Sequence, residues 1–510
     1  MKFHPLLLIS LIATAAFAAE KNAPTGRPVA SSAERLGTVS FSVSCAPAVE
    51  ARFTRGVALL HDFWYQEARQ QFEEIAKADP SCAMAHWGVA MSLFHQIWDR
   101  PDDATVAHGW REMQAAQAHP AKTAREREYV AALSGFYKPD QRNYQSRIEG
   151  YAAAMAKLYQ DYPGDTDAGA FYALSLLAAQ PPNEASVTLN QKAMAVLSPL
   201  FVKYPDHPGV VHYIIHACDT PSLAPDGLAA AKHYGEIAAS APHAVHMPGH
   251  IFARLGMWQE DIDSNVGSVA ASHAAEARKQ SGAMDQFHSD DFLLYAYLQS
   301  GQDAKAKAVL HDSAAAIAHF ESMSDMGEHY MVGMFPYYRT KLPIFFDLVM
   351  RDWKAAAVIE AIAGAPPETQ TLTFWARTVA AGHLHQPRQA RENLVAYDAL
   401  IEKIKLGRHA YFADSTGASI TRGEMLADIL LELKRPQEAL AEYKKALILS
   451  PNRFNGLFNA GMAAEAAGDK VQAQAYYTTL LKLTDNGSQS TRPEFVHAKA
   501  AVSAARVAVK

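Results

Sequence analysis

Histidines are the residues of this chain whose types and spacing are most informative about chemistry. The chain has 510 residues and 22 histidines, and five of these form two groups. His212 and His216 are four residues apart, while His243, His246 and His250 are separated by three and by four. Such spacings place side chains on one face of an α-helix. His246 also follows His212 by 34 residues, and His250 follows His216 by the same 34.

Imidazoles from neighbouring helices can converge on one ion, and zinc, copper, nickel and iron all accept them. The predicted metal ligands are His212, His216, His246 and His250. The sequence contains no HExxH, CxxC or CxxCH motif, so metalloprotease, zinc-ribbon and c-type haem sites are not supported. Two other interpretations stay open at this point. The histidines could line a ligand-binding groove without a metal, or they could be structural.

A repeat pattern in the sequence indicates which helices position these side chains. Apolar residues recur at helical spacing from Ala48 almost to the end, and β-like alternation is scarce. Small residues, a small-then-aromatic step and an exit proline recur in register, as in Gly56, Ala68, Phe72 and Pro80, in Ala439, Tyr443, Ala446 and Pro451, and in part in Gly461, Ala473 and Tyr477. A period near 34 residues with these features indicates helix pairs.

Over most of residues 46–485 this pattern resembles the tetratricopeptide-repeat superfamily. The resemblance implies an all-α fold, a tetratricopeptide-like helix-turn-helix solenoid wound as a right-handed superhelix. We expect one such solenoid over residues 45–510, with residues 493–508 forming a final helix that caps the open end. Residues 363–370 look like a linker between two helices.

The resemblance also implies where the side chains point. Counted back from the turn at Gly256, the second histidine group lies on the first helix of a pair and faces the concave groove. The residues expected to line that groove or bind a ligand are His243, Arg254, His288 and Asp291. His243, His288 or Asp291 would then complete the ligand set of the metal or transfer protons.

The central block further resembles a group of exported bacterial repeat proteins. The strings that carry this resemblance are HAVHMPGHIFARLGMW at 243–258, ADPSCAMAHWGVAMS at 78–92 and DFLLYAYLQSG at 291–301. The group has no assigned activity, so the resemblance implies a fold and export but no chemistry.

The amino terminus has the pattern of a cleavable signal peptide over residues 1–18. Lys2 precedes an apolar stretch from Leu6 to Ala16, and Ala16-Phe17-Ala18 is a small-x-small cleavage site. The apolar stretch is too short for a transmembrane helix. We therefore expect cleavage after Ala18, a flexible segment over residues 19–44, no membrane span, and a periplasmic or secreted protein.

Three cysteines occur, and an oxidising compartment would permit one disulfide. Cys45 and Cys82 each precede a predicted helix, 37 residues apart, so a bridge between them depends on geometry that the sequence leaves open. Cys218 would then be free.

Composition narrows the function classes. The formal net charge is −6 and no long basic run occurs, which disfavours nucleic acid as a partner. Our first hypothesis is a scaffold that binds a peptide, protein or small ligand in its groove. The alternative is a metal-binding protein or metalloenzyme that uses zinc, copper or iron. The sequence does not decide whether the chain is an enzyme.

Overall fold

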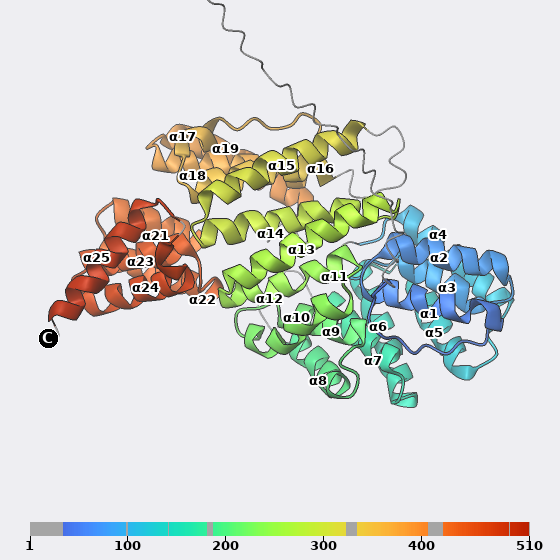
Figure 1. Ribbon diagram of the computed structural model, residues 1–510. Coiled ribbons are helices and arrows are strands. Elements are labelled where there is room, and N and C mark those ends of the chain that lie inside the picture. Colours follow the sequence, from blue (N-terminus) through green and yellow to red (C-terminus); the bar gives the residue numbers. More distant parts are fainter. Residues whose placement is uncertain are drawn as a thin grey trace, which may run out of the picture. The chain divides into compact units, whose positions relative to one another are not determined.

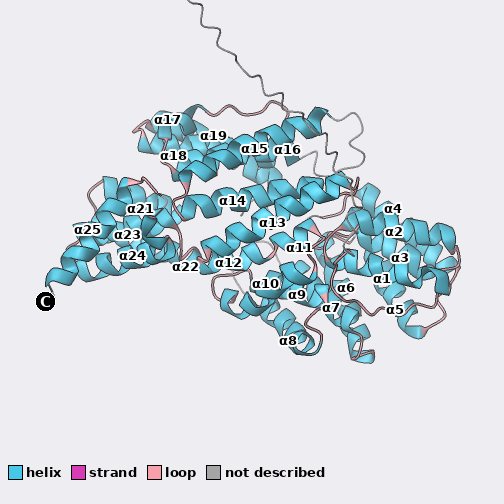
Figure 2. Ribbon diagram, viewed as in Figure 1, coloured by secondary structure: helices cyan, strands magenta, loops and turns pink. Residues whose placement is uncertain are grey.

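The computed structural model describes residues 34–97, 100–140, 142–180, 187–322, 334–405, 422–488 and 490–508. Within these ranges every regular element is an α-helix or a short 3₁₀-helix (Figure 2). The all-α prediction is confirmed. The predicted signal peptide and residues 19–33 lie outside the described residues. Of the helices described, none combines the length and the apolar character needed to cross a bilayer.

The first half of the chain forms a succession of helices that pack mainly on their neighbours in sequence (Figure 1). They are α1 (Pro47–His61), α2 (Tyr65–Ala78), α3 (Ala83–Ser92), α4 (Asp103–Ala118), α5 (Ala124–Tyr137), α6 (Tyr144–Asp161), α7 (Thr166–Ala178), α8 (Thr188–Lys203), α9 (Pro208–Cys218), α10 (Ala224–Ile237), α11 (Pro242–His246), α12 (Pro248–Leu255) and α13 (Trp258–Ala277).

The second half continues the pattern through η1 (Ala283–Asp285), α14 (Gln286–Gln299), α15 (Asp303–Ser322), α16 (Phe335–Val349), α17 (Trp353–Val358), α18 (Pro367–His383), α19 (Pro387–Lys405), α21 (Arg422–Glu432), α22 (Pro436–Leu449), α23 (Phe454–Ala466), α24 (Lys470–Leu483), η3 (Asp485–Gly487) and α25 (Pro493–Ala508). The final helix has the predicted bounds. The linker predicted at 363–370 lies four residues earlier, at 359–366, because Pro367 is suited to the first position of a helix and begins α18.

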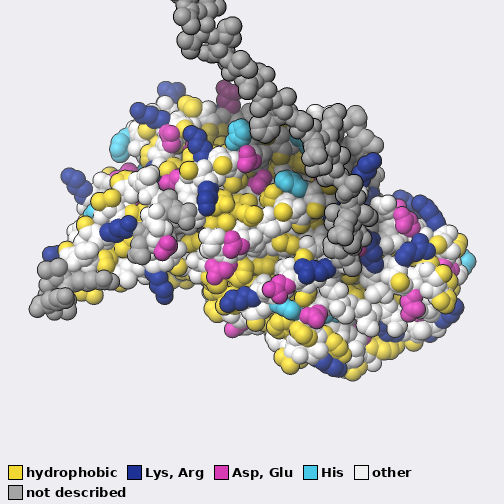
Figure 3. Space-filling model, viewed as in Figure 1, with side chains coloured by type: hydrophobic (Ala, Val, Ile, Leu, Met, Phe, Trp, Pro, Cys, Tyr) yellow, Lys and Arg dark blue, Asp and Glu magenta, His cyan; other side chains and the backbone are white. Residues whose placement is uncertain are grey.

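Local sequence explains where the helices begin and end. Thr123 and Glu126 form a capping box at the start of α5. Gly256 ends α12 with φ of +70°, a backbone conformation that favours glycine. The buried apolar residues form four clusters: one lies within residues 36–275, two interleave over residues 258–404, and one lies within residues 427–498. On the face drawn in Figure 3, acidic and basic side chains are interspersed.

An extended segment, residues 35–45, ties the first helices to much later ones. Gly37 N–H donates to the carbonyl of Ile237, and Thr38 N–H donates to that of Asp206. Phe41 is buried, and Cys45 forms a disulfide with Cys82. The prediction of a flexible segment over 19–44 therefore does not hold for residues 34–44. Alternate side chains of this segment enter the core, which fixes it in place.

The chain also makes contacts that a simple row of repeats would lack. The Asn452 amide donates to the carbonyl of Arg254, and Asn455 donates to that of Val349. Arg492, just before α25, forms an ion pair with Asp303 at the start of α15. These contacts join the last helix pairs to the middle of the chain.

Candidate functional site

The structure gathers six histidines from three successive regions of the chain. His212 and His216 lie on α9, the second group lies on α11 and α12, and His288 lies on α14. His243, His246 and His250 were expected on one continuous helix. Pro248 lacks an N–H group, so the helix is interrupted at Met247, although this residue keeps helical dihedral angles. The histidines therefore still share one side of the α11–α12 segment.

The six imidazoles form two groups of three. We call His212, His216 and His243 the first triad, and His246, His250 and His288 the second triad. In each triad, one ring nitrogen from every histidine lies within 4.8 Å of those of the other two. The sequence predicted His212, His216, His246 and His250 as one ligand set. The structure instead divides these four between the triads and adds His243 to one and His288 to the other.

The second triad has well-defined hydrogen bonds on its outer side. His246 Nδ1 lies 2.6 Å from Asn265 Oδ1. The Asn265 amide nitrogen donates to the carbonyl of Asp261 and to its carboxyl group, which leaves Oδ1 as the acceptor. His246 must therefore carry its proton on Nδ1, and in the neutral ring Nε2 is a lone pair.

His250 is oriented in the same way by a carboxylate. Its Nδ1 lies 2.9 Å from Asp219 Oδ2, and Asp219 Oδ1 accepts a hydrogen bond of 2.8 Å from Arg254 Nε. Burial opposes ionisation of Asp219, but the charge of Arg254 and the hydrogen bonds from His250 and Arg254 outweigh it and hold the pKa of that carboxyl below its usual range. His250 therefore donates through Nδ1, and Nε2 is again the lone pair of the neutral ring.

The consequence is an electrostatic conflict inside the second triad. His246 Nε2 and His250 Nε2 lie 3.0 Å apart, and each is a lone pair when the rings are neutral. Two acceptors at this distance repel each other unless a cation, either a proton or a metal ion, lies between them. The His288 ring is also close, with its centroid 4.2 Å from that of His246.

The first triad resembles the second, but its neutral rings can form a hydrogen bond with each other. His212 Nδ1 donates to the carbonyl of His61 at 2.6 Å, so its Nε2 is a lone pair. His216 Nε2 lies 3.1 Å from that atom. Among the residues that the structure describes, none accepts a hydrogen bond from His216 Nδ1, so a neutral His216 with its proton on Nε2 can donate to His212.

Burial keeps these imidazoles in the form that binds metals. It lowers the pKa of His216 and of His288 to about 3, with the neighbouring His250 contributing to both shifts. Burial also lowers the pKa of His212, His243 and His246 well below the usual value. Metal ligation requires neutral imidazole, so protons compete weakly at these positions.

Two of the residues expected in the groove have other partners. Asp291 is buried in an ion pair with Lys341 of α16 and is not part of either triad. Arg254 pairs with Asp219 and so acts on His250 indirectly. His243 and His288 do join the cluster. His212, His243 and His246 are buried, whereas His216, His250 and His288 are partly exposed.

Four important neighbours of the triads were not identified from the sequence. Asn265 and Asp261 lie on α13, where nothing in their spacing points to the histidines. Phe63 packs on the first triad, with its ring 4.4 Å from His212 and 5.6 Å from His243. It lies in the α1–α2 turn with φ of +56°, about 150 residues earlier in the chain. Phe292 packs on the second triad.

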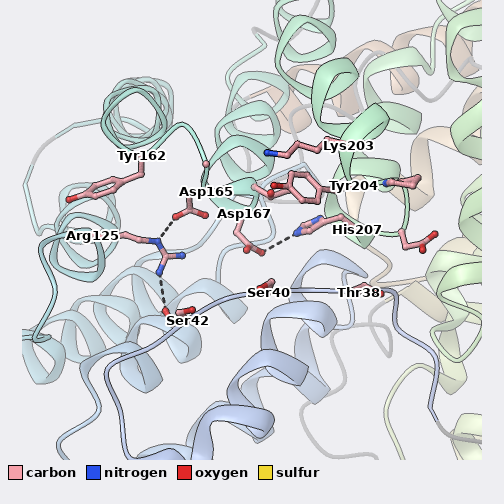
Figure 4. Close-up of a pocket in the computed structure, with 14 residues that line it drawn as sticks. Thr38, Ser40, Ser42, Arg125, Tyr162, Asp165, Asp167, Lys203, Tyr204 and His207 are labelled. Carbon is pink, nitrogen blue, oxygen red and sulfur yellow. Dashed lines mark hydrogen bonds and ion pairs between the residues drawn. The ribbon is translucent and has the colours of Figure 1, made fainter.

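A second polar feature lies near the extended segment. A pocket of about 700 Å³ has Arg125, Asp165, Asp167 and His207 in its walls (Figure 4). Arg125 pairs with Asp165 and donates to the carbonyl of Ser42. The charged groups at this end of the pocket therefore neutralise one another.

The Asp167 carboxylate at that pocket is shared by two histidines. His61 Nε2 lies 2.9 Å from Asp167 Oδ1, and His207 Nε2 lies 3.3 Å from the same oxygen. Burial lowers the pKa of His61 to about 4. Tyr213 donates to His61 Nδ1, so both ring nitrogens of His61 are engaged. These hydrogen bonds account for the cluster as a structural network.

Comparisons with known proteins give one match to a family model. Residues 424–453, which span α21 and α22, match the family model of the tetratricopeptide repeat. No curated protein gives a significant match. Among solved structures, the chain is similar to a human IFIT1 dimer with PPP-AAAA, at 13% identity, covering 84% of this chain and 89% of that one, with a TM-score of 0.36.

A second similar structure is that of Naa15/Naa10 bound to HypK-THB, at 10% identity, covering 90% of this chain and 92% of that chain, with a TM-score of 0.23. These TM-scores are too low to carry an argument about function. The chain is thus similar to tetratricopeptide-repeat proteins in its helix-pair architecture and, over residues 424–453, in sequence.

Proposed function

We propose that this chain binds a transition-metal ion through the second triad, His246, His250 and His288. The observation that carries the proposal is the pair of facing Nε2 atoms of His246 and His250, 3.0 Å apart, each with its Nδ1 committed to an oxygen acceptor. A metal ion between the rings would turn the repulsion of two lone pairs into two coordinate bonds. The third imidazole then completes a three-nitrogen set.

The donor set fits such an ion. Zinc, copper and iron all accept neutral imidazole, and three protein ligands leave a coordination position for water or another exchangeable ligand. Asn265 and Asp219 hold the outer nitrogens of two ligands, as the supporting groups of metal sites commonly do. Because His250 and His288 are partly exposed, an ion can approach from solvent.

Metal content of the purified chain tests the proposal. The protein should be prepared without a polyhistidine tag, dialysed against zinc, copper or iron, and analysed for bound metal. We expect at least one stoichiometric ion in the unaltered chain, and loss of the most tightly bound ion in a His246→Ala/His250→Ala variant. His233→Ala is the matched control, because His233 lies on α10 in an exposed ion pair with Asp206 and should leave metal content unchanged.

Since His246 is buried, the double variant could lose metal by misfolding. His250→Gln is therefore the second variant, because His250 is partly exposed and glutamine can still hydrogen-bond to Asp219. A folded His250→Gln protein with reduced metal affinity supports the site. Unaltered protein that takes up none of the three metals would refute it.

Capture of a protein or peptide is a second candidate, in line with the general use of tetratricopeptide-type scaffolds in binding. The observation that favours it is a group of exposed apolar side chains at the end of α21, inside the matched repeat. Leu426 and Ile429 are three residues apart on α21, Leu433 follows just after the last residue of that helix, and each is at least 40% exposed. An amphipathic helix of a partner could cover such a group. A photo-crosslinker at position 429 should then label one partner, and Leu433→Asp should abolish the labelling.

We also propose that the chain is exported. The signal-like pattern before Ala18 motivates this, and the Cys45–Cys82 disulfide supports it, because disulfides persist mainly in oxidising compartments. Amino-terminal sequencing of the protein from a periplasmic fraction should begin at Ala19. Intact Met1 on the functional protein in the cytoplasm would contradict the proposal.

A further inference from the structure

The first triad repeats the construction of the second. In both, a histidine near the start of the set has Nδ1 committed to an oxygen, the carbonyl of His61 for His212 and the amide oxygen of Asn265 for His246. In both, the histidine four residues later brings its Nε2 to 3.0–3.1 Å from the Nε2 of that residue. The 34-residue offset seen in the sequence therefore corresponds to two equivalent imidazole pairs.

Each pair has a third imidazole and an apolar ring. His243 completes the first triad and His288 the second. Phe63 lies against all three rings of the first triad, at 4.4–5.6 Å, and Phe292 lies against all three of the second, at 4.6–5.5 Å. An apolar shell of this kind limits solvent access to a metal and strengthens its electrostatic interactions.

The two triads are direct neighbours. The ring centroids of His243 and His246 lie 5.9 Å apart, and those of His216 and His250 lie 6.2 Å apart. His243 and His288 are stacked at 6.3 Å. No backbone element separates rings at these distances, so ions held by the two triads would interact strongly.

Carboxyl groups lie on both sides of the cluster. Asp219 contacts His250 directly. On the side of the first triad, the ring of Tyr234 stacks on His212 at 5.1 Å, and the Tyr234 hydroxyl donates to buried Asp62. When ionised, carboxyl groups so placed offset part of the charge of two dications.

We infer that His212, His216 and His243 hold a second metal ion, so that the six imidazoles form one two-ion centre. This inference rests on the proposed function of the second triad. The second ion binds more weakly than the first for two reasons. In the first triad His216 can donate a hydrogen bond to the lone pair of His212. In addition, an ion that enters this triad is repelled by the ion already bound to the second. Each ion keeps a coordination position for a small exchangeable ligand such as water or hydroxide.

Titration of the untagged protein with Cu²⁺ tests the two-ion centre. Equilibrium dialysis should give two ions per chain, the second with an affinity at least about 10-fold lower. Electron paramagnetic resonance should show an isolated Cu²⁺ signal at one equivalent and a signal broadened by a neighbouring spin at two. His243→Ala and His216→Gln should each leave one tight ion, and the control His233→Ala should leave two.

The outcomes separate the two hypotheses. One tight ion in the unaltered chain, unaffected by His216→Gln, would overturn the two-ion centre and leave the proposed function standing. A second ion that persists in both first-triad variants, without spin broadening, would show binding elsewhere and would also overturn it. No bound ion at all would refute both hypotheses.

Discussion

Neutralising Asp219 and neutralising Arg254, the two charged residues next to His250, should shift metal affinity in opposite directions. Asp219 accepts hydrogen bonds from His250 at 2.9 Å and from Arg254 at 2.8 Å, and its side chain is 25% exposed. Removing the group that orients a metal-bound histidine usually lowers affinity about 10–100-fold. Because solvent and Arg254 screen this carboxylate, we expect Asp219→Asn to lie at the lower end, about 10–30-fold, or roughly 1.4–2 kcal/mol.

Arg254→Gln removes a positive charge that weakens the pull of Asp219 on the histidine. We therefore expect it to raise metal affinity about 3–10-fold, since the carboxylate then acts on the ion without competition. Isothermal titration of both variants with Zn²⁺ at constant ionic strength measures the two effects. A loss of affinity in both variants would refute the electrostatic reasoning and indicate that the residues matter only for folding.

The remaining predictions concern stability and follow from buried charges and from the disulfide. Burial raises the pKa of Asp290 to about 7, so ionisation of this side chain destabilises the fold. The destabilisation is absent below about pH 4 and complete above about pH 7. Asp290→Asn should therefore raise the free energy of unfolding, measured by urea denaturation, by about 2–4 kcal/mol at pH 8 and change it little at pH 4. Arg453→Met removes the guanidinium group that pairs with buried Glu424 and should cost about 3–5 kcal/mol at pH 8. The cost should be smaller at pH 5, where the carboxyl group can be protonated, and an equal cost at both pH values would contradict this. Cys45→Ser should lower the stability of the amino-terminal helices by about 2–4 kcal/mol, visible as faster hydrogen exchange in α1 to α3, and the effect should be matched by Cys82→Ser.

The fold class was predictable because the helix-pair pattern is local. Small and aromatic residues meet where two helices cross, as at Gly461, where an added Cβ would lie 2.3 Å from the ring of Tyr477. That requirement appears in the sequence at a fixed spacing, and it identified the repeat that also matches the family model. The final helix was predictable for another reason, because a solenoid needs a helix that covers its open end.

The histidine cluster was predictable in part. Helical periodicity and the 34-residue offset identified the two pairs, His212 with His216 and His246 with His250. Their division into separate triads was not predictable, because it depends on which third histidine each pair meets. That meeting is decided by packing between helices, which insertions in the middle repeats obscure.

The supporting residues could not have been found from periodicity. His61 and Phe63 reach the first triad because the α1–α2 turn contacts α9, and this contact joins residues about 150 positions apart. Residues 35–44 belong to the segment 19–44, which was predicted to be flexible because it has no helical period. It is fixed by Phe41 in the core, by backbone hydrogen bonds and by the disulfide.

The most direct test of the central claim is a crystal structure of the untagged protein, grown with Zn²⁺ and measured at the zinc absorption edge. We expect an anomalous peak from a zinc ion bonded at about 2.0–2.1 Å to ring nitrogens of His246, His250 and His288, with the Nδ1 atoms of the first two still hydrogen-bonded to Asn265 and Asp219. A well-ordered second triad with no peak, in crystals whose protein takes up zinc elsewhere, would contradict it.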